Sequence, residues 1–126
     1  MNKPVRILLV EDEIITAMQM KAELQKSGFT VLGYVATGEK ALAFACEERP
    51  DLILMDINLA GKIDGIDAAV SIQAVYPVPV IFMTGYEDSS MRERAEKTHP
   101  LQFLVKPVLM PSLVSIIGTY FNTTTE

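Results

Sequence analysis

Residues 52–56 read LILMD, a continuous apolar run that ends on the carboxylate of Asp56. Four further short apolar segments occur along the chain: VRILLV at Val5–Val10, TVLGYV at Thr30–Val35, VPVIFM at Val78–Met83 and LQFLV at Leu101–Val105. Three of the five are nearly continuous in apolar residues, which is typical of strands buried on both faces of a parallel sheet.

Each apolar run is followed by a segment with helical periodicity. In the first of these, Ala17, Met20 and Leu24 recur at the spacing of one helix face. The predicted limits are Gly28 as the end of the first helix, Thr37 and Pro50 around the second, Asp64 to Tyr76, Asp88 or Ser89 to about Thr98, and about Pro111 to Phe121. Five strands alternating with five helices predict an α/β fold with helices on both faces of a parallel sheet.

The composition limits the class of protein. The chain has 126 residues, 49% of them hydrophobic, and a net charge of −5, which indicates one ordinary soluble domain with a sizeable core. The acidic balance argues against direct nucleic-acid binding, and no apolar run is long enough for a membrane span. A single cysteine fits a reducing compartment, so we expect a cytoplasmic location. We expect one domain over residues 1–126, with a core at about 4–121, a polar tail at 122–126 and no output domain.

Polar residues that follow the apolar runs are the candidates for chemistry, because ligands of such sheets bind beyond the carboxyl ends of the strands. Glu11 and Asp12 follow the first run, Asp56 the third, Thr84 the fourth and Lys106 the fifth. Crowded carboxylates favour a divalent cation such as Mg²⁺, and a nearby lysine suits a phosphoryl group. The set predicts phosphate chemistry in which Asp56 attacks phosphorus while the metal, Lys106 and Thr84 stabilise the phosphoryl oxygens.

Four motifs in this order, ILLVEDE, LILMDINL, IFMTGY and FLVKP, closely resemble the receiver domain of two-component response regulators. The resemblance covers roughly Pro4 to Phe121. It implies a flavodoxin-like, doubly wound three-layer (βα)5 sandwich with a five-stranded parallel sheet in the order 2-1-3-4-5. It also implies that Asp56 accepts a phosphoryl group from the phosphohistidine of a sensor histidine kinase or phosphotransfer protein. Such a domain is a signalling switch and not an enzyme, since it catalyses only its own phosphorylation and dephosphorylation.

The resemblance also assigns metal ligands. Glu11 and Asp12 match the acidic pair that holds Mg²⁺ (or Mn²⁺), Asp56 is a further ligand, and the backbone carbonyl of Asn58 completes the shell. It implies no other cofactor.

The remaining assignments concern switching. Lys106 and Thr84 match the pair that binds the phosphoryl oxygens, and Phe103 matches the aromatic residue that turns inward when the threonine moves. Asn58 and Tyr86 lie at positions that tune dephosphorylation in the family. The peptide bond between Lys106 and Pro107 is cis in many members.

Two departures from the family pattern carry further expectations. The segment INLAGKI after Asp56 is one residue longer than in the commonest receivers, which we expect to alter partner docking or phosphate lifetime. The segment Val108–Phe121 carries no charge. We therefore expect partial exposure of Leu109, Val114, Ile117 and Phe121, and a homodimer or domain contact through the fourth helix, fifth strand and fifth helix.

Three other functions fit the sequence less well than the receiver assignment. A small phosphatase of the haloacid dehalogenase type also uses an Asp nucleophile, but its nucleophile usually follows the first strand, with a second Asp where this chain has Asn58. A pseudo-receiver that only binds a partner is disfavoured by the complete set of acidic, Thr and Lys residues. A flavodoxin-like cofactor carrier would need a Thr/Ser/Gly-rich loop after the first strand, which here reads EDEII.

Overall fold

A computed structural model describes residues 3–86 and 88–122 of the chain. Strands and helices alternate strictly along it. In chain order the elements are β1 (Arg6–Val10), α1 (Ile14–Lys26), β2 (Thr30–Val35), α2 (Gly38–Glu48), β3 (Leu52–Asp56), α3 (Gly65–Gln73), β4 (Val80–Thr84), α4 (Ser89–Glu96), β5 (Gln102–Val105) and α5 (Met110–Phe121).

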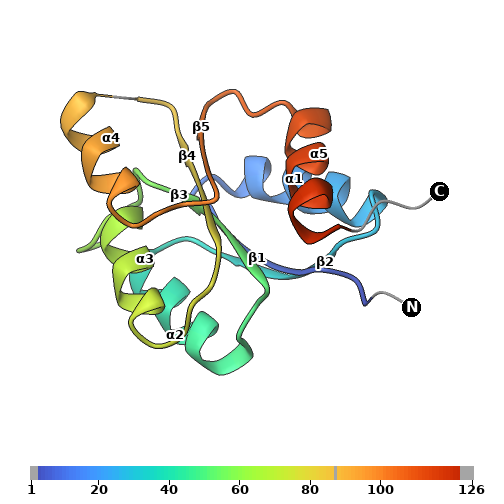
Figure 1. Ribbon diagram of the computed structural model, residues 1–126, viewed down its shortest axis with the longest axis horizontal. Helices are drawn as coiled ribbons and strands as arrows, with labels where there is room; N and C mark the ends of the chain where they lie inside the picture. Colours follow the sequence, from blue (N-terminus) through green and yellow to red (C-terminus); the bar gives the residue numbers. More distant parts are fainter. Residues whose placement is uncertain (1–2, 87, 123–126) are drawn as a thin grey trace.

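The five strands form one parallel sheet in the order β2-β1-β3-β4-β5, which confirms the predicted fold (Figure 1). Helices α1 and α5 cover one face of the sheet, and α2, α3 and α4 cover the other. The two faces bury separate apolar clusters, one centred on residues such as Leu9 and Leu54 and the other on Leu8 and Ile53. This alternation within continuous apolar strands is what burial on both faces requires.

The strand and helix predictions are confirmed with small shifts at the ends. Strand β3 includes Asp56, and β4 begins at Val80 because Pro77 and Pro79 have no N–H to donate to a ladder. Helix α3 ends at Gln73, earlier than the predicted Tyr76. Three helices begin at predicted limits with a capping side chain. Thr37, Asp64 and Asp88 accept hydrogen bonds from backbone N–H groups three residues later, at 3.2, 2.9 and 2.7 Å.

The charge-free helix α5 is only partly exposed. Leu113 and Ile117 are fully buried against the sheet, so the prediction that Ile117 stays partly exposed is wrong. Its position four residues after Leu113 places it on the same helix face, which explains its burial. Leu109, just before the helix, is 66% exposed as predicted, and self-association through this region stays a prediction. No helix in the described segments combines the length and apolarity needed to cross a bilayer.

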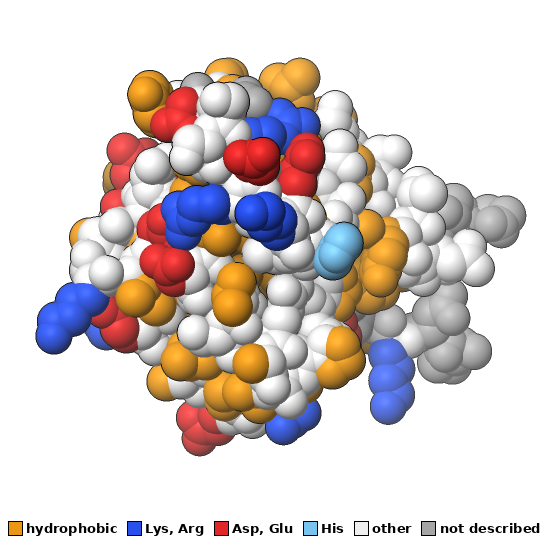
Figure 2. Space-filling model, turned by 60° about the vertical axis from the view of Figure 1, so that its left-hand side comes forward, with side chains coloured by type: hydrophobic (Ala, Val, Ile, Leu, Met, Phe, Trp, Pro, Cys, Tyr) orange, Lys and Arg blue, Asp and Glu red, His pale blue; other side chains and the backbone are white. Residues whose placement is uncertain are grey.

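Helix α4 is tied to the start of α3 by charged side chains. Arg94 makes ion pairs with Asp64 at 3.0 Å and with Asp67 at 3.1 Å. The guanidinium lowers the pKa of Asp64 although partial burial of that carboxyl acts in the opposite direction. Figure 2, which brings the α3–α4 side of the molecule forward, shows basic and acidic side chains intermixed there. These ion pairs hold α4, the helix that follows β4, against the start of α3.

Candidate functional site

Strand register brings the predicted residues to one edge of the sheet. Asp56, the last residue of β3, pairs with Met83, and Thr84, the last residue of β4, pairs with Val105. Glu11 directly follows β1, where Val10 pairs with Met55. The carboxyl ends of four strands therefore surround one small region, as the sequence predicted.

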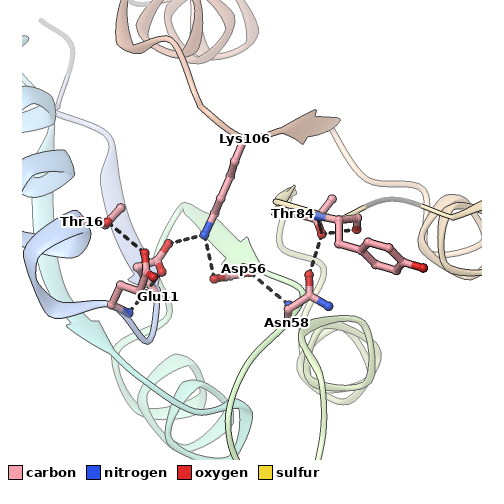
Figure 3. Close-up of polar contacts among 8 residues, drawn as sticks. Glu11, Thr16, Asp56, Asn58, Thr84 and Lys106 are labelled. Carbon is pink, nitrogen blue, oxygen red and sulfur yellow. Dashed lines mark hydrogen bonds and ion pairs between the residues drawn. The ribbon is translucent and has the colours of Figure 1, made fainter.

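Lys106 lies between two buried carboxylates (Figure 3). Its Nζ donates to Oε1 of Glu11 at 3.1 Å and to Oδ2 of Asp56 at 3.0 Å. The side chains of Glu11 and Asp56 are 0% and 4% exposed, while that of Lys106 is 26% exposed. A cation shared by two desolvated carboxylates offsets much of their mutual repulsion.

The pKa shifts follow from this arrangement. Burial raises the pKa of Glu11, with the negative charge of Asp56 acting in the same direction and the hydrogen bond from Lys106 opposing both. Burial opposes the charged form of Lys106, but its hydrogen bonds to Asp56 and Glu11 outweigh burial and raise its pKa. Lys106 thus stays a cation at neutral pH, directly beside Asp56.

Glu11, Asp12 and Asp56 form an acidic cluster. One carboxylate oxygen from each lies within 4.8 Å of the other two. Oxygens this close could share one divalent cation after small side-chain adjustments, with water supplying the remaining ligands. An all-oxygen, anionic set of this size fits a hard divalent cation, and these three residues could hold one.

The turn after β3 positions Asp56. The backbone N–H of Asn58 donates to Oδ1 of Asp56 at 3.1 Å, and the N–H of Gly65 donates to the carbonyl of Ile57 at 2.9 Å. Gly65 packs directly against the backbone carbonyl of Asp56, and an added Cβ would also lie 2.9 Å from the Cα of Ile57. The absence of a side chain at position 65 lets α3 start this close to the candidate nucleophile.

Thr84 is fully buried, and its hydroxyl points to Asn58 (Figure 3). Its Oγ1 lies 2.6 Å from Oδ1 of Asn58 and 2.6 Å from the backbone carbonyl of Tyr86, and it accepts a bond from the Tyr86 N–H at 3.1 Å. The Tyr86 residue is 66% exposed. Asn58 therefore bridges Asp56 and Thr84, through its backbone to the first and its side chain to the second.

Phe103 lies on the edge strand β5, opposite Phe82 of β4, and is partly exposed. The guanidinium carbon of Arg92, from α4, stands 4.4 Å from the centre of its ring. Arg92 also pairs with Glu96 at 3.0 Å. The bond between Lys106 and Pro107 is cis, as the resemblance implied.

The longer segment after Asp56 is attached to the start of α2. Ala60 forms a parallel bridge with Thr37, and the N–H of Lys62 donates to Oε2 of Glu39 at 3.1 Å. Gly61 takes the positive φ of 104° that this turn needs. The extra length is therefore ordered against α2, and its effect on docking or phosphate lifetime stays a prediction.

The sequence did not reveal the side-chain contact from Asn58 to Thr84, the position of Arg92 over Phe103, or the attachment of Lys62 to Glu39. Each joins residues from different elements through side-chain geometry. The start of α3 beside Asp56 did have a local signal, because Asp64 is a preferred N-cap residue.

Comparison with known proteins gives a consistent result. The family model described as the response regulator receiver domain matches residues 7–118. The transcriptional regulatory protein PdtaR of Mycobacterium tuberculosis is 32% identical over 90% of this chain and 55% of its own length. The phyllosphere-induced regulator PhyR of Methylorubrum extorquens is 37% identical over 88% of this chain and 41% of its own. The chain thus spans about half the length of these relatives.

A solved structure agrees with the sequence comparisons. The crystal structure of the signal receiver domain of a modulated diguanylate cyclase from Desulfovibrio desulfuricans G20 superposes with a TM-score of 0.88 at 33% identity, covering 96% of each chain.

Proposed function

Since the chain belongs to the response regulator receiver domain family, we propose that Asp56 accepts a phosphoryl group from a phosphohistidine on a sensor histidine kinase or phosphotransfer protein. The observation that carries this proposal is Lys106 hydrogen-bonded to both Asp56 and Glu11, with Asp12 completing an acidic cluster beside them. A nucleophilic carboxylate, a fixed cation and an anionic metal site are the parts that phosphoryl transfer needs.

The chemical step follows from these positions. A carboxylate oxygen of Asp56 attacks phosphorus, an O–P bond forms, and the P–N bond to the donor imidazole breaks with its electron pair leaving on nitrogen. Lys106 neutralises charge on the phosphoryl oxygens, and the hydroxyl of Thr84 donates a hydrogen bond to one of them. The N–H of Asn58, already bonded to Oδ1, holds the carboxylate in position.

Mg²⁺ is the cation that best fits Glu11, Asp12, Asp56 and the carbonyl of Asn58. When bound, it neutralises charge on the transferring group. The four protein groups would hold it by oxygen atoms alone.

Incubation with acetyl phosphate and Mg²⁺ tests the proposal. We expect the intact mass of the protein to rise by one phosphoryl group, with the modification mapped to Asp56, and no rise when the metal is chelated. An unchanged mass under all donor and metal conditions would remove the proposal and favour a pseudo-receiver, which the family match alone also allows.

A phosphatase of the haloacid dehalogenase type is the weaker candidate. Asp56 follows the third strand of the chain, and position 58 is Asn. Turnover of small phosphate esters at a rate well above that of acyl-phosphate hydrolysis would favour it.

Mg²⁺ is expected to stabilise the fold, because it relieves repulsion within the acidic cluster and binds only the folded arrangement. At a Mg²⁺ concentration about ten times its dissociation constant, the free energy of unfolding should rise by about 1.4 kcal/mol. Thermal or urea unfolding would measure this gain. Asp12→Asn should abolish this gain. Glu13→Gln, which removes the same charge from the exposed neighbouring residue, should retain it. Equal losses in both variants would contradict the assigned cluster.

The start of α1 supplies the surface on which the phosphodonor protein would dock. Ile14, Ile15 and Met18 are 61%, 68% and 52% exposed, and they follow the acidic residues of the site directly. A groove of about 880 Å³ runs along a different face of α1, between this helix and the segment after β5, and is lined in part by Glu13, Lys106 and Met110. Apolar side chains of this size, exposed next to a reactive carboxylate, fit a helical partner that presents its phosphohistidine.

Ile15→Asp is expected to lower the rate of phosphotransfer from a phosphohistidine protein by about tenfold, the cost of losing one well-packed apolar anchor. The rate with acetyl phosphate should change by less than about twofold, since that donor needs no docking surface. Val75→Asp is the matched control: Val75 is 48% exposed but follows α3 at the opposite end of the sheet, and should leave both rates unchanged. Equal loss with both donors would contradict docking through α1.

A further inference from the structure

We propose that the side chain of Asn58 holds the Thr84 hydroxyl away from the phosphorylation site, so that it opposes the phosphorylated arrangement of the domain. The inference rests on the proposed function and names a regulatory element within that site. It concerns the side chain of Asn58, separately from the metal-binding role expected for its carbonyl.

The Thr84 hydroxyl has more hydrogen-bond acceptors within reach than its single proton can serve. Two acceptors lie 2.6 Å from Oγ1, namely Oδ1 of Asn58 and the carbonyl of Tyr86. A threonine hydroxyl has one proton, so it donates to only one of them at a time. A third contact, the N–H of Tyr86 at 3.1 Å, occupies a lone pair of the same oxygen.

A phosphoryl oxygen on Asp56 would need that same proton. To donate to it, Thr84 must leave both present acceptors. The Tyr86 carbonyl belongs to the backbone and is present whatever side chain stands there. The amide of Asn58 belongs to a side chain, so a substitution at position 58 removes this acceptor.

Asn58 is well placed for this competition (Figure 3). Its backbone N–H donates to Oδ1 of Asp56, while its side-chain Oδ1 lies 2.6 Å from Oγ1 of Thr84, so the residue lies between the two. The Asn58 residue is exposed whereas Thr84 is completely buried, so the amide can return to water when Thr84 is released. Its removal leaves no buried polar group on position 58, and the fold should tolerate it.

Beryllofluoride with saturating Mg²⁺ measures the effect without hydrolysis of a phosphate. Asn58→Ala should raise the affinity for beryllofluoride, followed by ¹⁹F NMR or calorimetry, by about fivefold, the worth of one net hydrogen bond of about 1 kcal/mol. The substitution keeps the backbone N–H and carbonyl at position 58. Thermal unfolding of the variant checks that the fold is retained.

A double-mutant cycle with Thr84→Val separates this route from a direct contact between Asn58 and the phosphoryl group. If Asn58 acts through the hydroxyl, its substitution should change the affinity by less than about twofold once Thr84 is Val. A fivefold effect that persists in that background, or no effect in the parent, would overturn the inference while leaving the proposed function intact. A parent protein that binds no beryllofluoride at all would instead overturn both.

Discussion

Asp56→Asn is expected to abolish phosphorylation, with no mass increase above about one-hundredth of the parent level under acetyl phosphate and Mg²⁺. An amide oxygen carries no negative charge and is a poor nucleophile towards phosphorus. The fold should persist, because Lys106 keeps its hydrogen bond to Glu11 and an amide oxygen at position 56 can still accept from the Asn58 N–H. Intact-mass measurement gives the extent of modification, and circular dichroism checks the fold.

Asp51→Asn is the matched control for this variant. Asp51 immediately precedes β3, the strand that Asp56 ends, and its Oδ2 accepts the N–H of Arg6 at 2.9 Å. The same chemical change at the other end of one strand should leave phosphorylation as in the parent. Modification of the Asp56→Asn protein to the parent level would place the acceptor elsewhere.

Gly65→Ala is expected to have the largest effect on stability, lowering the free energy of unfolding by about 3 kcal/mol. The new Cβ would collide with the backbone carbonyl of Asp56 and lie 2.9 Å from the Cα of Ile57 and from Cγ of Met55. Backbone atoms at the end of β3 cannot yield without moving Asp56. We therefore expect the phosphorylation rate to fall together with the unfolding free energy, which urea denaturation would measure.

Gly33→Ala provides the comparison. A Cβ at position 33, on the edge strand β2, would meet only the ring of Phe44 at 3.5 Å, an ordinary van der Waals contact. Its effect on the free energy of unfolding should stay below about 1 kcal/mol, and phosphorylation should be unaffected. Similar losses from both substitutions would indicate a general cost of replacing glycine and not a specific contact beside Asp56.

Much of the site was predictable because it depends on backbone regularities. Strands such as Leu52–Asp56 are continuous in apolar residues, so their burial and parallel pairing follow from composition and spacing. Once the strands are parallel, residues that follow them must meet at one edge. The convergence of Lys106, Asp56 and Glu11, which are separated by 50 and 95 residues, was therefore predictable, whereas the hydrogen bonds among them came from the structure.

The tertiary structure alone decided how side chains at that edge are oriented. Strand register does not fix the direction of the Thr84 hydroxyl, whose Oγ1 lies 2.6 Å from both Asn58 Oδ1 and the Tyr86 carbonyl. The burial of Ile117 likewise depends on how α5 lies against the sheet. Hydrophobic periodicity is local and can be read along the chain, whereas rotamers and hydrogen-bond partners depend on groups that only the packed fold brings together.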